Sequence, residues 1–490
     1  MYCAYITRIR NLRKHPNADR LLIGECYGNS VVVDLQMKPD SLGIYFPVDG
    51  KLGREFAEKN NLLRKKDADG KSIGGYLDPE KRNITAMKLR GEKSDGLFLP
   101  LKSLESFTDI TKLKEGMVIT ELNGVKICEK YIPIRQTPNK RGGTEQHKHK
   151  KFSKPAVTCP MFLEHIDTAQ LAYNLNEFKP GDHVEITLKM HGTSQRTGYL
   201  PVITGYADSL LARLRNHFRI RHGKPLIHDG APISEYQYVD GTRRTEKLEG
   251  GFYGNDSFRK AHADKFRGKL WKGETVYYEV VGFTDSGAPI MPSVSNAKVK
   301  DKEFSATYGD MTVFSYGCSP DGIGTEPMGY YDGECSEPCA YNQLPKSECY
   351  VYRMTMTSPD GHVVEYPPDF MRTRCAEIEV HTVPVLYEAS FFDDGDSPFI
   401  GYDTETVQKN VMELAERYCD GADPVGKTHI REGIVARIVN RPAFTAFKFK
   451  NFSFKLIEGL IKDTASAPDM EEAQEVMGEP ASEGNDDTGI

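Results

Sequence analysis

The stretch that decides how the chain folds is KMHGTS, residues 189–194. It follows VEITL, residues 184–188, where alternation and β-branched residues predict a strand. Lys189 would end this strand, and Gly192 follows three residues later. Because glycine has no side chain, the lysine amine can contact a phosphate there with little steric hindrance. Because Lys-x-x-Gly is common, a surface lysine before an ordinary turn is the more frequent meaning of this pattern taken alone. The other segments of the chain must decide between the two.

The composition is that of a soluble globular protein with more than one domain. The chain has 490 residues, of which 39% are hydrophobic and 27% are charged. The formal net charge of -6 is unevenly placed, because residues 463–490 contain many acidic residues and no basic one. No apolar run is long enough to span a bilayer, and the first residues do not have the pattern of a signal peptide. We therefore expect a cytoplasmic protein with no membrane partner.

The ten cysteines are irregularly spaced, which favours free thiols in a reducing compartment. One cluster leaves an alternative open, since Cys335 and Cys339 are close in sequence to Cys318 and Cys349. The cluster lacks the paired Cys-x-x-Cys spacing that is typical of structural zinc sites. Free thiols are the favoured interpretation, and a zinc site is the alternative.

The first 130 residues contain short strand-like segments between turns and no long helical period. The clearest of these segments are residues 31–33, 43–46 and 96–99. This pattern predicts a small β-barrel. Two phrases, HPNADRL at residues 15–21 and MKLRGEKSDG at residues 87–96, resemble phrases of OB-fold modules that bind structured RNA. Turns of any small barrel are the alternative interpretation of both phrases.

Two segments have the composition of connections rather than of a folded core. Residues 131–158 contain prolines, paired glycines and a basic run at residues 148–151, which predicts an exposed linker. Its charge could touch a nucleic-acid backbone, although such runs are more often only solvated. Residues 463–490 are acidic with few large apolar side chains, and we expect a disordered tail. A second domain is then expected at residues 159–462.

Charged residues within the second domain mark candidate phosphate contacts. Arg243 and Arg244 follow a glycine turn, and paired guanidinium groups can grip phosphates in a forked geometry. An exposed basic turn explains them equally well. Glu279 lies in the middle of the strand-like residues 275–283, where a charge is costly unless it faces solvent or a site.

A long irregular region, residues 284–348, interrupts this pattern and has the character of an insertion. The strand pattern resumes around Tyr352, whose ring could stack on a base. Tyr316, inside the insertion, is a second aromatic candidate for the same role. Core packing is the more frequent fate of either ring.

The last part of the domain supplies a further carboxylate and two lysines. Residues 421–428, GADPVGKT, match the P-loop pattern, but a helix is expected before them and a strand after them, which is the wrong context. Glu432 opens that following strand. Lys448 and Lys450 alternate with phenylalanines and so share one face of the next strand, which residues 452–455 (FSFK) are expected to continue. A phosphate clamp and the wet face of an edge strand are both compatible with the two lysines.

Taken in order, these features are Lys-x-x-Gly, an arginine turn, a carboxylate strand, an aromatic strand, Glu-Gly and Lys-x-Lys. The order resembles the covalent nucleotidyltransferases, which include RNA ligases, DNA ligases and capping enzymes. KMHGTS is most similar to RNA ligases, where histidine often precedes the glycine. Together with the N-terminal phrases, residues 2–462 resemble the ATP-dependent RNA ligases that carry an N-terminal OB-fold module before the adenylyltransferase domain.

This resemblance implies an α+β fold: an N-terminal OB-fold β-barrel at residues 1–130, then a mixed antiparallel-sheet nucleotidyltransferase (ATP-grasp-like ligase) domain. It implies that ATP and Mg²⁺ or Mn²⁺ are the cofactors. The implied catalytic residues are Lys189, Glu279, Glu432, Lys448 and Lys450, and the two glutamates would serve the metal. The implied nucleotide-binding residues are these five together with His165, Asp167, Thr168, His191, Gly192, Arg243, Arg244 and Tyr352.

The resemblance also implies a three-step reaction. Lys189 would take AMP from ATP, the AMP would pass to a 5′-phosphate, and a 3′-OH would displace it. Family members seal nicks whose 3′-OH end is RNA, so a nicked duplex is the expected partner, and we expect a monomer. A chain that begins near Ser153 is expected to form the lysyl-adenylate without the N-terminal module, which would serve the joining step.

One departure and two rival activities qualify this implication. Leu188 occupies the place where some related ligases have an acidic residue near the adenine, which leaves the base contact open. Capping guanylyltransferases and DNA ligases share the lysine chemistry, but an OB domain normally follows their last lysine motif. Only about 40 residues follow Lys450, too few for another domain. A non-catalytic OB-fold RNA-binding protein is the rival of another class.

Overall fold

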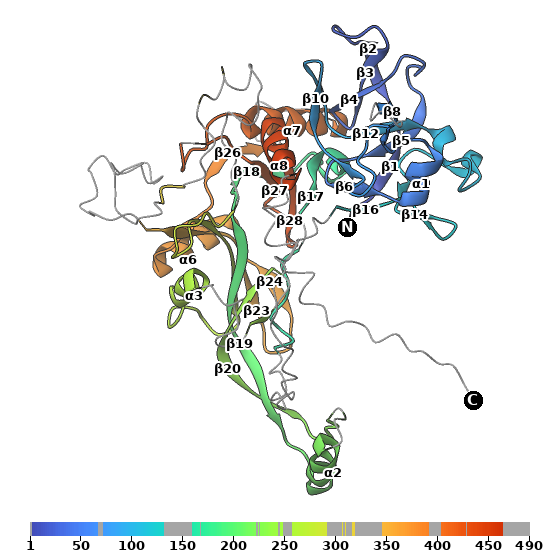
Figure 1. Cartoon of the computed structure of the whole chain (residues 1–490). Helices are drawn as coiled ribbons and strands as arrows, with labels where there is room; N and C mark the ends of the chain where they lie inside the picture. The colour runs from blue at the N-terminus through green and yellow to red at the C-terminus, as the bar shows by residue number, and fades with distance from the viewer. Residues whose placement is uncertain are drawn as a thin grey trace, which may run out of the picture.

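In the computed structural model, the chain is an α+β protein in which two parts build separate sets of sheets (Figure 1). We call residues 2–131 the N-terminal unit and residues 159–463 the C-terminal unit. The structure describes residues 2–66, 72–131, 159–291, 306, 309, 316–318, 345–391 and 403–463, except residues 167, 222–223, 225, 244–245, 248–256 and 428. Residues 132–158 of the linker predicted at 131–158, and residues 464–490 of the predicted acidic tail, therefore lie outside the described residues.

Short strands dominate the N-terminal unit. One sheet has the spatial order β12 (Leu97–Pro100), β5 (Leu42–Phe46), β1 (Ala4–Arg8) and β13 (Val118–Ile119). Another has the order β2 (Arg10–Lys14), β3 (Leu21–Cys26) and β4 (Asn29–Asp34). A further sheet has the order β16 (Cys128–Lys130), β6 (Gly50–Leu52) and β9 (Asn83–Ile84). Three hairpins add β7 (Lys65–Lys66) and β8 (Ser72–Gly74), β10 (Met87–Leu89) and β11 (Glu92–Ser94), and β14 (Glu121–Leu122) and β15 (Val125–Lys126). The six-residue helix α1 (Arg54–Lys59) packs Phe56 and Ala57 inward. The strands predicted at residues 31–33, 43–46 and 96–99 are confirmed as parts of β4, β5 and β12.

In the described part of the C-terminal unit, the strands form two sheets. The first has the order β17 (Ala169–Gln170), β28 (Thr445–Lys450), β27 (Gly433–Ile438), β18 (His183–Lys189) and β26 (Val385–Ser390). The second has the order β21 (Glu246–Lys247), β20 (Pro232–Thr242), β19 (Thr193–Tyr206), β22 (Glu274–Gly282), β23 (Ser347–Thr357) and β24 (Val363–Glu365), with β25 (His381–Thr382) paired to β23. Since β18 ends at Lys189 and β19 begins at Thr193, the KMHG turn carries the chain from one sheet to the other.

Among the described residues, five α-helices accompany these sheets. They are α2 (Leu210–Arg221), α3 (Ser257–Asp264), α6 (Pro368–Ile378), α7 (Thr404–Cys419) and α8 (Phe452–Asp463). The long pair β19 and β20 extends away from the rest of the molecule and carries α2 at its far end (Figure 1). No helix in the described part of the chain is long and apolar enough to span a membrane.

The predicted helix after residue 403 is confirmed as α7. The Asp403 side chain caps it by accepting a hydrogen bond from the Thr406 backbone N–H at 2.9 Å. Val407, Val411 and Ala415 are buried along its inner stripe and pack against the first sheet. The GADPVGKT segment lies between this helix and strand β27, which is the context that argues against a P-loop.

The prediction that a strand continues through residues 452–455 is wrong. These residues begin helix α8, because the Asn451 side-chain oxygen accepts hydrogen bonds from the backbone N–H groups of Ser453, at 2.7 Å, and Phe454, at 3.4 Å. The alternating letters FSFK are compatible with a strand, but asparagine is a strong helix-capping residue and ends β28 at Lys450. The helix turns the chain back toward the N-terminal unit (Figure 1).

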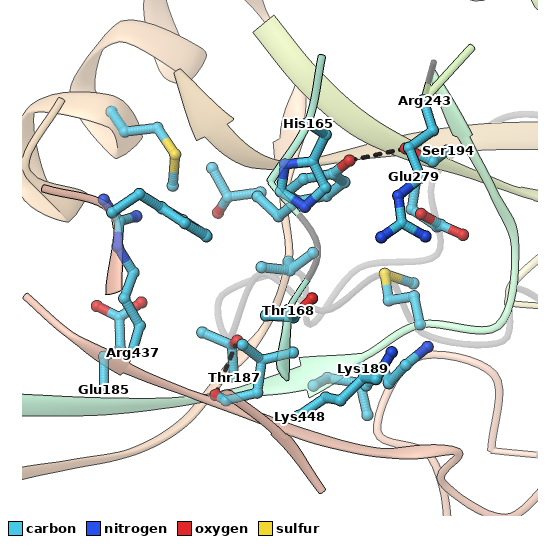
Figure 2. A pocket seen from close by; sticks show the side chains of 18 of the residues that line it. His165, Thr168, Glu185, Thr187, Lys189, Ser194, Arg243, Glu279, Arg437 and Lys448 are labelled. Atoms are coloured by element: carbon cyan, nitrogen blue, oxygen red, sulfur yellow. Dashed lines mark hydrogen bonds between the residues drawn. The ribbon is translucent and has the colours of Figure 1, made fainter. Parts of the chain in front are cut away.

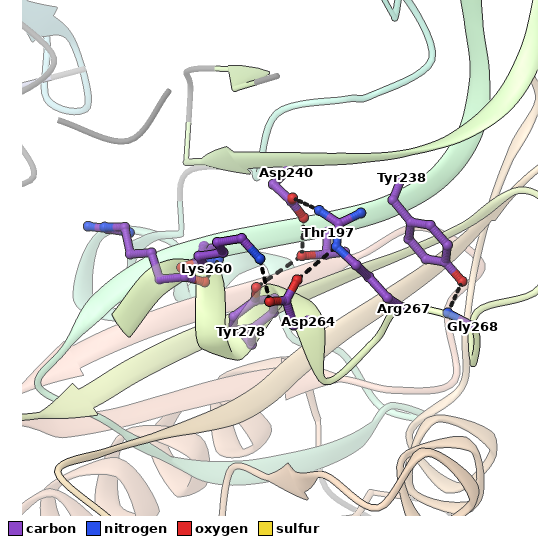
Figure 3. A network of polar contacts seen from close by, with 10 residues as sticks. Thr197, Tyr238, Asp240, Lys260, Asp264, Arg267, Gly268 and Tyr278 are labelled. Atoms are coloured by element: carbon purple, nitrogen blue, oxygen red, sulfur yellow. Dashed lines mark hydrogen bonds and ion pairs between the residues drawn. The ribbon is translucent and has the colours of Figure 1, made fainter. Parts of the chain in front are cut away.

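A polar network braces the second sheet on the side of α3 (Figure 3). Arg267 forms ion pairs with Asp240 at 2.6 Å and with Asp264 at 2.9 Å, and so ties strand β20 to the end of α3. The Thr197 hydroxyl on β19 donates to Asp240 at 3.0 Å. Burial raises the pKa of the Asp240 carboxyl, although Arg267 opposes this rise. None of Arg267, Asp240, Asp264 and Thr197 is among the residues that line the pocket between the two sheets.

Candidate active site

The turn between the two sheets is shaped by its glycine. A Cβ atom on Gly192 would lie 2.4 Å from the Val280 carbonyl oxygen, so only glycine allows the turn to approach β22 this closely. Thr193 follows and is buried, with its hydroxyl accepting a hydrogen bond from the Arg259 guanidinium at 2.5 Å. The backbone therefore fixes where Lys189 leaves the first sheet.

Lys189 is held by a buried carboxylate. Its ammonium nitrogen lies 2.6 Å from Glu432 Oε1, and His191 Nδ1 lies 3.2 Å from Glu432 Oε2. β18 pairs with β27, and the register places Lys189 opposite Gly433. Burial by itself would raise the pKa of the Glu432 carboxyl, but Lys189 and Lys450 outweigh burial and hold this pKa well below its usual range. Glu432 is therefore a permanent anion between the two predicted lysines.

The two lysines of β28 share a face, as their spacing predicts, but have opposite surroundings. Lys448 points into a pocket, where burial, followed by the charges of Lys189 and Lys450, lowers its pKa to about 7. The Lys450 nitrogen lies 2.9 Å from Glu458 Oε2 and 3.5 Å from Glu432 Oε1. Burial opposes the charged form of Lys450, but Glu458 and Glu432 prevail and raise its pKa. Lys450 is thus a paired cation, and Lys448 is a poorly compensated one.

The pocket between the two sheets brings most of the predicted residues together (Figure 2). From the predicted set it is lined by His165, Thr168, Lys189, Arg243, Glu279, Tyr352 and Lys448. His191, Gly192, Glu432 and Lys450 stand directly behind it, on the turn and around the Glu432 carboxylate. Asp167 and Arg244 lie outside the described residues, so their predicted roles remain predictions.

The two aromatic candidates have different positions. Tyr352 lines the pocket, its hydroxyl lies 2.8 Å from the Ser194 hydroxyl, and its ring centroid lies 4.9 Å from that of His165. Tyr316 is 2% exposed, packs against the His429 ring and accepts a hydrogen bond from the His191 backbone N–H at 2.6 Å. Tyr316 therefore supports the turn from the core, and of the two candidates Tyr352 is the one that lines the pocket, together with Phe444.

Burial also controls the charge of His165. Burial lowers the pKa of this imidazole well below its usual value, and the charge of Arg353 lowers it further. Its backbone N–H donates to the Arg243 carbonyl, which ties the segment before Thr168 to the arginine turn. His165 is accordingly neutral and can contact a ligand without adding charge.

Sequence reasoning missed the far side of the pocket. Glu185 is buried there and accepts a hydrogen bond from Arg372 at 2.8 Å, with Arg437 nearby (Figure 2). Glu185 and Thr187 alternate with Lys189 along β18, so period-2 spacing would have found both. Arg372 comes from α6, almost two hundred residues away in sequence, and no local pattern could have indicated it.

The carboxylates can be compared with the needs of a divalent metal ion. Glu279 lines the pocket on the same side as Lys189 and provides the hard oxygen ligand that Mg²⁺ and Mn²⁺ prefer (Figure 2). Both oxygens of Glu432 are already engaged, one by Lys189 and one by His191. Of the two predicted metal residues, Glu279 therefore fits direct coordination better, and Glu432 fits a role as partner of the lysine.

The cysteine cluster gives little support for zinc. Cys335 and Cys339 lie outside the described residues. Cys318 and Cys349 are buried, and burial raises the pKa of the Cys318 thiol to about 12, which favours the neutral thiol. Among the described residues, His262, Glu348 and Cys349 could form a ligand group, but the Lys265 ammonium binds Glu348 where a cation would lie.

Comparison with known proteins agrees with this architecture. No family model matches the chain, and no curated protein matches it. Among solved structures, a Naegleria gruberi RNA ligase variant with ATP and Mn superposes with a TM-score of 0.52 at 14% identity, covering 94% of this chain and 98% of that chain. A second variant of that ligase, also with ATP and Mn, gives a TM-score of 0.51 at 15% identity over 92% of this chain and 98% of that one. The chain has the fold of this RNA ligase. The likeness covers both units, whereas the assignment of the N-terminal unit as an OB-fold barrel remains a prediction.

Proposed function

We propose that the protein is an ATP-dependent RNA ligase that joins a 3′-OH end to a 5′-phosphate end through a lysyl-adenylate. The observation that carries this proposal is the position of Lys189, whose amine lies between the buried Glu432 and a pocket lined by Lys448, Arg243 and Glu279. This arrangement combines one nucleophile with cations for phosphates and a carboxylate for a metal ion. The RNA-ligase fold, found in structures that contain ATP and Mn, supports the same assignment.

In the first step, Lys189 Nζ attacks the α-phosphate of ATP. A phosphoramidate N–P bond forms, the bond from the α-phosphorus to the bridging oxygen breaks, and pyrophosphate leaves. The amine must give up a proton, and Glu432 is the carboxylate that holds the amine until it reacts. Lys448 and Arg243 oppose the negative charge that develops on the phosphates. Glu279 would hold a Mg²⁺ or Mn²⁺ ion, whose chemistry there would be to polarise the α-phosphate.

The rest of the pocket would hold the nucleoside. Tyr352 offers a ring for stacking on adenine, and the neutral His165 and the Thr168 hydroxyl lie beside it. Glu185 and Arg372 form a fixed polar pair on the far side. The Leu188 departure is then of little consequence, because other polar groups line this side and can meet the base.

The two later steps complete the joining. AMP passes from Lys189 to the 5′-phosphate of a nucleic acid, and a 3′-OH attacks that activated phosphate and expels AMP. We propose a nicked duplex with an RNA 3′-OH strand as the substrate, a monomeric cytoplasmic enzyme, and an OB-fold role for residues 1–130. Residues 131–158 would link this module to the ligase domain at 159–462, and the acidic segment 463–490 would follow.

Two assays separate the proposal from its rivals. The protein is incubated with α-labelled ATP or GTP and Mg²⁺ or Mn²⁺ and run on a denaturing gel. We expect covalent label from ATP; label from GTP only would favour a capping guanylyltransferase, and no label a non-catalytic RNA-binding protein. Nicked duplexes that differ only in an RNA or DNA 3′-OH strand are then compared, and equal sealing of both would favour a DNA ligase.

A further inference from the structure

Helix α2 stands at the far end of the arm that β19 and β20 form (Figure 1). It begins after Ser209, whose hydroxyl accepts a hydrogen bond from the Ala212 backbone N–H at 3.2 Å. The Asp229 carboxylate fixes Ser209 in turn, because it accepts hydrogen bonds from the Ser209 backbone N–H at 2.9 Å and from the Ser209 hydroxyl at 2.6 Å. The helix is therefore held in place by contacts within the arm itself.

One side of α2 is fastened to the arm. Its buried residues are Ala212 and Asn216, which lie one turn apart. The Asn216 side-chain amide donates to the Ile227 carbonyl at 2.8 Å, and its oxygen accepts from the Ile227 backbone N–H at 3.0 Å. Because these two hydrogen bonds fix the rotation of the helix about its axis, they determine which of its residues face outward.

The side of α2 that faces outward is apolar. Leu210, Leu214 and Phe218 recur every four residues and so share one face of the helix, with Leu211 beside them. Leu210, Leu211, Leu214 and Phe218 are 77%, 75%, 60% and 59% exposed. A helix on the surface of a soluble protein normally turns such a stripe toward the core. Since α2 buries an asparagine and exposes its leucines, its outer face has the character of a docking surface.

Positive charge flanks this apolar stripe. Residues 210–221 contain no acidic residue and four arginines, which are Arg213, Arg215, Arg219 and Arg221. At about 100° per residue, Arg213 lies on one side of the stripe, and Arg215 and Arg219 lie on the other. An occupant of this face must therefore offer apolar surface at its centre and negative charge along both edges.

These two demands select the class of occupant. A second copy of α2 would bring arginines against arginines, and this repulsion opposes self-association. A nucleic-acid backbone would pair with the arginines but would leave the leucines in water. An anionic lipid surface would meet the exposed Asp229 carboxylate beside the first turn of the helix. A protein groove with an apolar floor and acidic edges satisfies both demands, since such grooves receive amphipathic helices through side chains one turn apart.

We propose that α2 docks into an apolar groove of a partner protein, and that carboxylates line the two edges of this groove. Leu210, Leu214 and Phe218 would fill the groove, and the arginines would pair with the carboxylates. Because the helix is already formed and oriented by the arm, binding would not have to order it. The surface is separate from the pocket, so this inference goes beyond the proposed ligase activity and does not depend on it.

The test uses the full chain and calcium-loaded calmodulin as the probe, because its methionine-rich grooves accept basic amphipathic helices of many sequences. Fluorescence anisotropy of labelled calmodulin should show saturable binding that is lost when calcium is chelated. Leu214→Gln and Phe218→Gln should each weaken binding about tenfold or more. The double variant Arg213→Gln/Arg215→Gln should weaken it at low salt and less at high salt. The matched control is Val364→Gln, which replaces a 61% exposed side chain on β24 and should bind as the wild type does.

The substituted side chains are exposed, so the melting temperature and the rate of labelling by α-labelled ATP should keep their wild-type values. Absence of calmodulin binding, or equal binding by Leu214→Gln, would overturn the inference. Vesicles of equal parts phosphatidylcholine and phosphatidylserine, an RNA duplex without a nick and a synthetic peptide of residues 464–490 are the rival occupants. A rival that binds more tightly than calmodulin, and loses that affinity in Leu214→Gln or in Arg213→Gln/Arg215→Gln, would also overturn it. Failure of the wild-type chain to label with ATP would count against the proposed function alone.

Discussion

The two sides of the pocket use their charges differently. On one side, Lys189, Lys448 and Glu279 converge on the open space (Figure 2). On the other, Glu185 and Arg372 are paired with each other at 2.8 Å. The first side holds the poorly compensated Lys448, whose pKa burial lowers, whereas on the second side Glu185 is paired with Arg372 and lies near the buried Arg437. Under the proposed function, we expect the first side to face the reacting phosphates and the second to hold a part of the ligand that does not react.

The largest expected effect tests the phosphate side. Lys448→Met should slow adenylate formation by about 100-fold or more at saturating ATP, because it removes a cation aimed at the developing phosphate charge. Lys450→Ala should also slow adenylate formation severely. Without Lys450 beside it, Glu432 could hold the Lys189 amine in a different position. Single-turnover labelling measures both rates. Wild-type rates in both variants would mean that the phosphate clamp lies elsewhere.

A second test concerns the proton on Lys448. Its pKa of about 7 is depressed, so the amine is protonated below pH 7 and largely neutral at pH 8. A bound phosphate favours the charged amine and raises this pKa, so ATP binding at pH 8 should take up a proton. Calorimetry in buffers of different ionisation enthalpy measures the uptake. The uptake should shrink at pH 6 and disappear in Lys448→Met; an unchanged uptake in that variant would assign it to another group.

A substitution on the Glu185 side of the pocket should change a different kinetic constant. Arg372→Met leaves the buried Glu185 without its partner, and we expect KM for ATP to rise about tenfold while the rate at saturating ATP changes little. A Michaelis analysis of labelling separates the two constants. If Arg372→Met lowered only the maximal rate, the division of the pocket into reacting and holding sides would be incorrect.

The smallest effect on activity is expected far from both sides. Arg267→Met removes the ion pairs to Asp240 and Asp264 that brace the second sheet (Figure 3). It should destabilise the protein by about 1–3 kcal/mol, because the buried Asp240 loses its cation, yet leave the labelling rate within about twofold. Denaturant unfolding and labelling are measured side by side. A large loss of labelling in the folded variant would show that the network reaches the pocket.

The sequence singled out residues on the Lys189 side of the pocket and missed those on the Glu185 side, for a physical reason. Lys189, Glu432 and Lys448 lie at strand ends or in alternating strands, where local spacing determines which face a side chain occupies. Arg372 reaches Glu185 from a helix distant in sequence, and only the folded chain brings them together. The same limit explains α8, because the capping by Asn451 and the ion pair from Lys455 to Asp95 depend on three-dimensional contacts. The FSFK alternation showed neither.

The central claim is that Lys189 carries the AMP. The most direct measurement is mass spectrometry of peptides after incubation of the full chain with ATP and Mg²⁺ or Mn²⁺. We predict one AMP on the peptide that contains Lys189 and none in Lys189→Ala, a variant that should nevertheless seal a nick whose 5′-phosphate is already adenylated, because that step no longer needs the amine. AMP on another residue, or ATP-driven joining retained by Lys189→Ala, would contradict the account.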